Sequence, residues 1–206
     1  MPARLVIPVR PGHPGGQAGI EARMQELLPV KYYHVVFTLP HELNSLVMGH
    51  RKLLYRLLFD ASAQTLLTFA KDVKYLGATP GIISVLHTWG QQLSFPARLC
   101  HSGGHPHIHC IVSGGGITGD NDWKDAKKNT WLFLFPVKAM SIVYRGKFLH
   151  ALQQMIIKGE VTLPENTDSK QLFNLLYQKD WVVYAIRQLA DWRPSCSDRI
   201  PWKVHA

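Results

Sequence analysis

Strand-like and helix-like patterns alternate along this chain, and that alternation limits the folds it can adopt. Four runs are rich in β-branched and aromatic residues, which is typical of strands: residues 32–39, 82–89, 107–112 and 181–184. Apolar residues recur at helical spacing in three other segments: residues 20–28, 50–71 and 137–157. A further short helix is expected after Asp168 or Ser169, either of which is a suitable N-cap. This interleaving predicts one α/β or α+β domain built around a single sheet.

The charge balance favours an anionic partner. Lys and Arg total 23 against 14 for Asp and Glu, a formal charge of +9 in 206 residues. Basic side chains that neutralise phosphates release condensed counterions, so such a surplus suits nucleic acid, although charge alone does not separate DNA from RNA or from an anionic membrane. No apolar run reaches the roughly 20 residues needed to span a bilayer, and the first 20 residues lack a signal-peptide core. With only three scattered cysteines, the sequence predicts a soluble cytoplasmic protein that does not act on a membrane.

The strongest local feature is the segment His105-Pro106-His107-Ile108-His109-Cys110. In a strand, side chains two apart share a face, so His107 and His109 point one way and Cys110 the other. Two imidazoles on one face suit a divalent cation, with a further ligand from another element. The alternative is that these histidines are exposed or packed residues at a strand end. The remaining histidines are isolated in the sequence, and we expect structural roles for them, His34 and His87 included.

The His107-Ile108-His109 triplet resembles the His-hydrophobic-His signature of HUH endonucleases. The segments ELLPVKYYHVVFTLPHELN, TWGQQLSF, HPHIHCIVSGGG and KDWVVYA, in that order, are similar to rolling-circle insertion-sequence transposases of the IS-ninety-one-like group. The resemblance covers roughly residues 20–185.

The resemblance implies an α+β fold with a ferredoxin-like HUH core, a central antiparallel sheet flanked by helices. It implies that His107 and His109 hold Mg or Mn. Gln91, from the WGQ segment, is then the candidate third ligand, and Gln92 is an alternative. The implied substrate is single-stranded DNA, which a tyrosine on a downstream helix attacks to leave a 5′-phosphotyrosine and a free 3′-hydroxyl.

The chain departs from the family's pattern in three places. Residues 96–104 form an insertion before the histidines, which either bulges out or displaces the third ligand. Residues 1–19 lack the family's cysteine-rich zinc module, and residues 186–206 lack the family's tyrosine helix. We therefore expect irregular remnants at both ends, as after truncation or a frameshift, around a core at residues 20–185. Tyr184 is a weak candidate nucleophile.

Candidate DNA contacts come from two groups of basic residues, for which a solvated surface is the alternative: Arg51, Lys52 and Arg56 on the first long helix, and Lys124, Lys127 and Lys128 in the polar segment 117–130. That segment is expected to be a loop. Gly114-Gly115-Gly116 is expected to form a turn that ends the third strand.

The function predicted from these observations is that of a DNA transposase by descent, which binds DNA and a divalent metal and has little or no nicking activity as this chain. One alternative is a non-catalytic DNA-binding remnant. Another is a structural zinc protein in which Cys100, His105 or His107, and Cys110 surround one ion.

Overall fold

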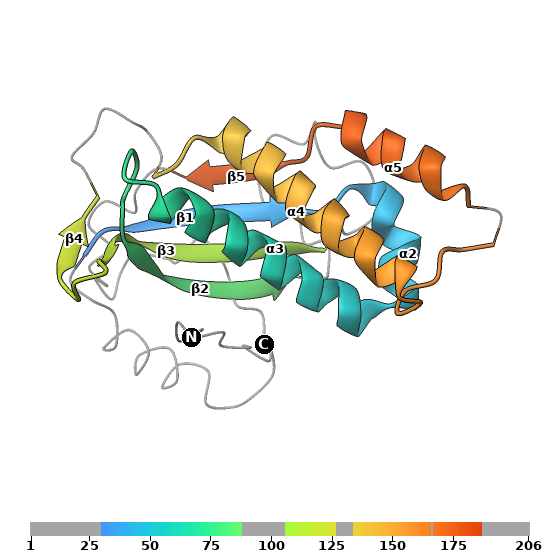
Figure 1. The fold of residues 1–206 in the computed structure, drawn as a ribbon, viewed down its shortest axis with the longest axis horizontal. Coiled ribbons are helices and arrows are strands. Elements are labelled where there is room, and N and C mark those ends of the chain that lie inside the picture. Colours follow the sequence, from blue (N-terminus) through green and yellow to red (C-terminus); the bar gives the residue numbers. More distant parts are fainter. Residues whose placement is uncertain (1–29, 88–105, 127–133, 166, 187–206) are drawn as a thin grey trace, which may run out of the picture.

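The computed structural model describes residues 30–87, 106–126, 134–165 and 167–186. The expected helix at 20–28, the insertion 96–104, and nearly all of both terminal segments lie outside this range. The described residues form five strands, four α-helices and one 3₁₀ turn (Figure 1). In chain order they are β1 (Tyr32–Thr38), the 3₁₀ turn η1 (His41–Leu43), α2 (Asn44–Gly49), α3 (Arg51–Lys71), β2 (Thr79–His87), β3 (His107–Ile117), β4 (Trp123–Asp125), α4 (Val137–Ile157), α5 (Ser169–Gln178) and β5 (Val183–Ile186).

The sheet has a ferredoxin-like topology. Its strand order is β2-β3-β1-β5, every neighbouring pair is antiparallel, and β4 adds to β3 at one end. The sequence of elements that builds it is β1, α3, β2, β3, α4 and β5, the split βαβ pattern in which two helical crossovers alternate with strands. The predicted α+β class, with a central antiparallel sheet flanked by helices, is confirmed.

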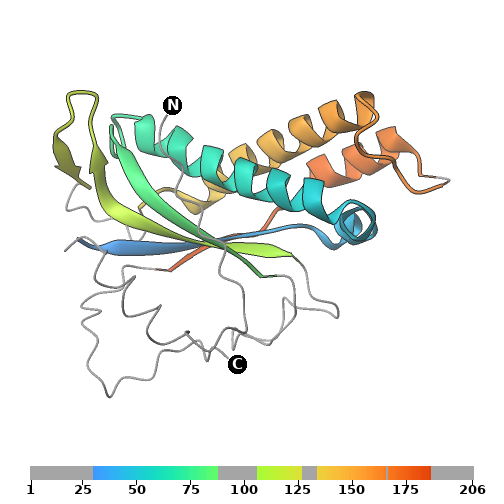
Figure 2. The same cartoon turned by 90° about the horizontal axis from the view of Figure 1, so that it is seen from below.

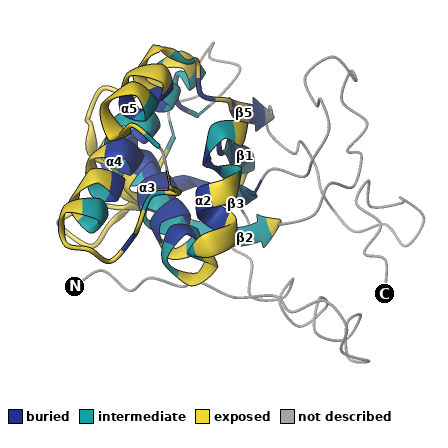
Figure 3. Ribbon diagram, turned by 90° about the vertical axis from the view of Figure 1, so that its right-hand side faces the viewer, coloured by how far each residue is buried: buried dark blue, intermediate teal, exposed yellow. Residues whose placement is uncertain are grey.

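Both long helices cover the same face of the sheet (Figures 2 and 3). The helix α3 packs on β2 and β3, while α4 packs on β5 and on α3. Strand alternation sends Val35 and Phe37 of β1, and Ile108 and Cys110 of β3, into this helical layer, where each is at most 2% exposed. Tyr144 and other large side chains of α4 fill the space between helix and sheet. The apolar core formed by the described residues therefore lies between the helices and one face of the sheet.

The three glycines do not form the expected turn, because β3 runs straight through them to Ile117. Close neighbours on both sides explain why no larger residue stands there. A Cβ on Gly115 would lie 2.4 Å from the Trp123 ring of β4, and one on Gly116 would lie 2.6 Å from the backbone of Thr79 in β2. The glycine run is therefore a strand segment against which two other strands pack closely.

The polar segment after β3 is also more ordered than expected, since residues 123–125 form β4. A tight turn joins β3 to β4, with Asn121 at a φ of 64°, a left-handed conformation that asparagine tolerates. The backbone N–H of Asn121 donates to the carbonyl of Thr118.

Other local predictions hold with small shifts of boundary. The helices at 50–71 and 137–157 are α3 and α4. Asp168 is the N-cap of α5, where its Oδ1 accepts hydrogen bonds from the backbone N–H groups of Lys170 (2.8 Å) and Gln171 (3.2 Å). Strand β2 begins three residues earlier than predicted, and β5 lies two residues later. Among the described helices, none combines the length and the apolar character that crossing a membrane requires.

Candidate metal centre

The face of the sheet opposite the helices carries a concentration of histidines. We call it the histidine face; it holds the side chains that alternate with the core residues of β1, β2, β3 and β5. Pairing aligns His87 of β2 directly with His107 of β3, and His109 with Val85 of β2 and Val36 of β1. Imidazoles from two neighbouring strands therefore meet at the end of the sheet where β2 finishes and β3 begins.

His87, His107 and His109 form a compact group, called the histidine cluster below. The ring centroid of His87 lies 4.3 Å from that of His109 and 5.4 Å from that of His107, and the last two are 5.0 Å apart. One ring nitrogen from each residue lies within 4.8 Å of the other two. Nitrogens bound to one tetrahedral ion at about 2.1 Å would be about 3.4 Å apart, so a modest closure of the side chains suffices. The cluster fits a divalent cation that accepts nitrogen ligands.

The environment lowers the pKa of two imidazoles of the cluster, those of His87 and His109. Burial, followed by the nearby His87, His107 and His34, lowers the pKa of His109 to about 3. Burial and the neighbouring His107 also lower the pKa of His87. A neutral imidazole offers a lone pair, whereas its protonated form offers none, so burial and the neighbouring rings favour metal binding by His87 and His109 at neutral pH.

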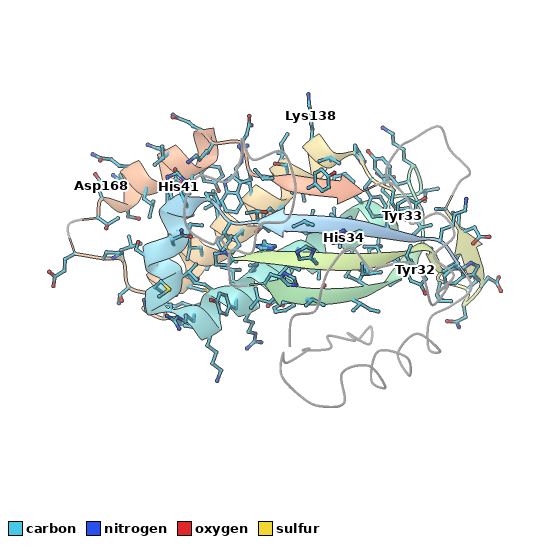
Figure 4. The ribbon with its side chains drawn as sticks, turned by 180° about the vertical axis from the view of Figure 1, so that it is seen from behind. Tyr32, Tyr33, His34, His41, Lys138 and Asp168 are labelled. Atoms are coloured by element: carbon cyan, nitrogen blue, oxygen red, sulfur yellow. The ribbon has the colours of Figure 1, made fainter. Side chains whose placement is uncertain are left out.

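A fourth histidine, His34 of β1, contacts the cluster from the side. Its Nε2 lies 2.7 Å from Nδ1 of His109, within hydrogen-bond distance. His34 is 8% exposed, and burial, followed by the nearby His87, lowers its pKa. Figure 4 shows His34 near the middle of the sheet, on the face turned away from the helices.

His34 and His87 are isolated in the sequence, but the fold brings both of them to His109. Both are distant from His107 in sequence, and only strand pairing brings them to it. A signal for His87 does exist, because it ends one strand and His107 begins the next. When two antiparallel strands follow each other in the chain, the end of the first and the start of the second lie at the same end of the sheet. The structure places His87 beside the predicted pair, while Gln91 and Gln92 lie outside the described residues.

Cys110 does not belong to this centre. It points into the helical layer, is fully buried, and has its Sγ 3.3 Å from Ser84 Oγ. A single ion cannot contact Cys110 and His107 from opposite faces of one strand. The arrangement in which these two residues share a structural zinc is therefore excluded; Cys100 and His105 lie outside the described residues.

The four candidate DNA contacts that the structure describes do not lie around the histidine cluster. Arg51, Lys52 and Arg56, called the α3 basic group below, are exposed on the helical layer, on the other side of the sheet. Arg56 Nε also lies 3.9 Å from the carboxylate of Asp60. Lys124 stands in β4, at the opposite end of β3 from His107. Lys127 and Lys128 lie outside the described residues.

All seven tyrosines of the chain are described, and strand alternation places two of them on the histidine face, Tyr32 and Tyr184. Tyr184 is 43% exposed and pairs with Val36, which in turn pairs with His109. Tyr184 and His109 are thus two strand spacings apart, about 10 Å between their backbones. The histidine cluster extends from His109 away from Tyr184, towards β2.

Comparison with known proteins identifies the same class of protein as the motifs do. Residues 81–196 match the family model Y2_Tnp, described as "Putative transposase". A "Putative transposase y4qJ" of Sinorhizobium fredii is 38% identical over 174 residues, which cover 81% of this chain and 41% of that protein. The transposase for insertion sequence element IS801 of Pseudomonas savastanoi pv. phaseolicola is 34% identical over 109 residues, 50% of this chain and 23% of that protein. The chain thus spans less than half the length of these relatives.

Among solved structures, the relaxase TrwC complexed with a 27-mer DNA has a TM-score of 0.40 at 15% identity, covering 59% of this chain and 44% of that one. A metal-bound structure of TrwC with oriT DNA has a TM-score of 0.35 at 13% identity, covering 72% and 64%. The family model matches more than half of this chain, from β2 through β5, and includes every member of the histidine cluster. The chain belongs to the Y2_Tnp transposase family.

Proposed function

We propose that this chain is the metal- and DNA-binding core of a rolling-circle transposase, with the core at residues 20–185, acting in the cytoplasm on single-stranded DNA. The observation that carries the proposal is the histidine cluster, in which three imidazoles converge on one face of a ferredoxin-like sheet. The family to which the chain belongs supports the same function.

We propose His87, His107 and His109 as the metal ligands. His107 and His109 are the pair expected from the sequence, and His87 replaces Gln91 as the leading candidate for the third position, because its ring already touches both of the others. A divalent ion bound there supplies a Lewis acid that polarises a phosphate oxygen and offsets the charge that develops during cleavage. The chain holds the three ring nitrogens in place because the histidines lie on two paired strands, β2 and β3.

The expected ion is Mg or Mn, and the donor set favours Mn. Imidazole is a ligand for transition metals, whereas Mg prefers oxygen and keeps its water shell. We therefore expect Mn to bind more tightly than Mg to a site with three ring nitrogens.

We propose that single-stranded DNA crosses the histidine face, since that is where a phosphate meets the cluster. The net charge of +9 favours a polyanion, and the exposed ring of Tyr184 offers a surface on which a base can stack. Contacts from the α3 basic group require DNA that passes around the end of the sheet. Strand cleavage needs a nucleophile that reaches the bound phosphate, and β1 separates Tyr184 on β5 from the nearest member of the cluster, His109 on β3. We therefore expect little or no nicking by this chain alone.

The test is a titration of Mn into the purified 206-residue protein, paired with a DNA assay. One site per chain in the wild type, lost in His107→Ala/His109→Ala, supports the proposed centre. Salt-dependent binding of single-stranded DNA without a covalent adduct supports a binding core that lacks its nucleophile. No Mn binding by the folded wild type would refute the metal site, and an adduct that disappears in Tyr184→Phe would refute the expectation of inactivity.

A further inference from the structure

We propose that His34 is a positioning residue for the metal centre: it accepts a hydrogen bond from Nδ1–H of His109 and so fixes the tautomer that presents Nε2 of His109 to the ion. The inference rests on the proposed metal site and adds to it a residue that no ligand motif includes. His34 acts through His109 and touches neither the ion nor the DNA in this role.

The geometry of the two rings is that of an in-plane hydrogen bond. Their planes differ by 14°, their centroids are 4.9 Å apart, and the two nitrogens are 2.7 Å apart. Rings stacked face to face keep their atoms at about 3.5 Å or more. A nitrogen–nitrogen distance of 2.7 Å therefore means that nearly coplanar rings meet edge to edge. The N–H of one ring then points along the lone pair of the other, which is the favourable alignment.

The direction of this hydrogen bond follows from the other nitrogen of His109. Its Nε2 is buried and has no hydrogen-bond partner among the described residues. If His109 accepted the bond at Nδ1, its proton would sit on Nε2, where it would be a buried donor without an acceptor and would block coordination. If His109 instead donates from Nδ1, its Nε2 carries a lone pair beside the rings of His87 and His107. The second arrangement serves the cluster, and it requires Nε2 of His34 to be the acceptor.

Strand register makes His34 the residue suited to this task. The residues directly opposite His109 are Val36 on β1 and Val85 on β2, whose side chains offer no hydrogen bond. His34 pairs with Ile111, so it is a diagonal neighbour of His109 on the same face. Such neighbours are about 7–8 Å apart at the backbone, a gap that two long planar rings can bridge. β1 is paired on both sides, with β3 and β5, so the acceptor stands on one of the sheet's central strands.

Partners of this kind raise the basicity of a ligating imidazole and hold its orientation, and their loss typically weakens metal binding by about 10–100-fold. The substitutions that test the role differ in where they put an acceptor. Gln at position 34 places its Oε1 as many bonds from the backbone as Nε2 of histidine. Asn places its oxygen one bond short, and Leu has no acceptor. All three are similar to or smaller than histidine in bulk, which limits overpacking at this buried position.

The experiment measures two quantities on wild type, His34→Gln, His34→Asn and His34→Leu, after their folding has been compared by thermal unfolding. The first is Mn affinity by calorimetric titration. The second is the tautomer of His109 in the metal-free protein, from long-range ¹H–¹⁵N correlation of ¹⁵N-histidine-labelled samples, with His109→Gln used to assign the signals. This second readout needs neither metal nor DNA, and a general loss of stability would not reproduce it.

We expect His109 to carry its proton on Nδ1 in the wild type and in His34→Gln, and to lose this preference in His34→Asn and His34→Leu. Mn affinity is expected to stay within about threefold in His34→Gln and to fall by about 10–100-fold in the other two. Two results would overturn the role of His34 but not the metal site: equal Mn affinity of the wild type and His34→Leu, or a His109 proton on Nε2 in the wild type. Absence of Mn binding in the wild type would overturn the metal site itself, and with it this role.

Discussion

The identity of the third metal ligand gives the most direct test of the site. His87→Ala removes one imidazole from the end of β2, while Gln91→Ala removes the ligand expected from the sequence. His150→Ala serves as a matched control, since His150 is exposed on α4, in the helical layer on the other side of the sheet. All three substitutions keep the strand pairing of β3, so each reports on one side chain.

The expected size of the effect follows from the geometry. One nitrogen from each of His87, His107 and His109 already lies within 4.8 Å of the others, against about 3.4 Å between ligands on a tetrahedral ion. His87 therefore needs to move only about 1.4 Å or less to coordinate. Losing a partner that merely orients a ligand costs about 10–100-fold in affinity, so losing a ligand itself should cost at least about 100-fold. That factor corresponds to about 2.8 kcal/mol of binding free energy.

The assay is calorimetric titration of Mn at neutral pH into wild type and the three variants. We expect the dissociation constant to rise by about 100-fold or more in His87→Ala and to change by less than about threefold in Gln91→Ala and His150→Ala. The reasoning is refuted if His87→Ala binds Mn like the wild type. A large loss in Gln91→Ala together with that result would identify the glutamine as the ligand.

Three further predictions concern the fold and the basic surface. Gly115→Ala should lower the free energy of unfolding by about 1–3 kcal/mol, because its Cβ would lie 2.4 Å from the indole ring of Trp123 in β4. Gly146→Ala in α4, where nothing lies within 4 Å of the added Cβ, should raise the free energy of unfolding by about 0.5–1 kcal/mol. Equal denaturation midpoints for the two variants would contradict this prediction. Burial raises the pKa of Cys110 to about 12, so in a Cys100→Ser/Cys196→Ser protein its thiol should stay protonated and resist iodoacetamide at about pH 8 until the protein unfolds, and alkylation at the rate of a free cysteine would show the core to be open. Replacing the α3 basic group with alanine should reduce the slope of log affinity against log salt by about 0.7 for each phosphate that the group neutralises, and an unchanged slope would exclude the group from the DNA path.

Local patterns in the sequence were sufficient to predict most of the elements. The helical spacing of apolar residues gave the bounds of α4, and a cap signal gave the start of α5, because both depend on residues within a few positions of each other. The glycine run misled for the opposite reason. Gly115 and Gly116 are required by the approach of β4 and β2, which are separate segments, so nothing near them in the sequence distinguishes a strand from a turn.

The residues of the candidate site also fall into two groups, those that the sequence pattern predicts and those that only the fold brings together. His107 and His109 share a face because they are two residues apart in one strand, and the sequence predicts this without knowledge of the fold. His34 and His87 join them through the register of β1 and β2 against β3, and a shift of one residue in either pairing would turn them to the other face. The α3 basic group illustrates the same limit, since its sequence does not tell which side of the sheet the helix covers.

The proposal that His87 is a ligand also bears on the insertion expected at residues 96–104. His87 ends β2 and His107 begins β3, and the two are held opposite each other by the pairing of those strands along their length. The position of His87 relative to His107 is therefore independent of how many residues join the strands. Residues 88–106 are 19 in number, and removing the nine of the insertion would leave ten, a change of about 0.6 kcal/mol in the entropy of closing the connection. Gln91, in contrast, lies within that connection, and its position depends on the path the connection takes. A metal centre built on His87, His107 and His109 does not depend on the length of the connection, whereas a centre that includes Gln91 does. The expected insertion is therefore compatible with a metal site formed by the three histidines.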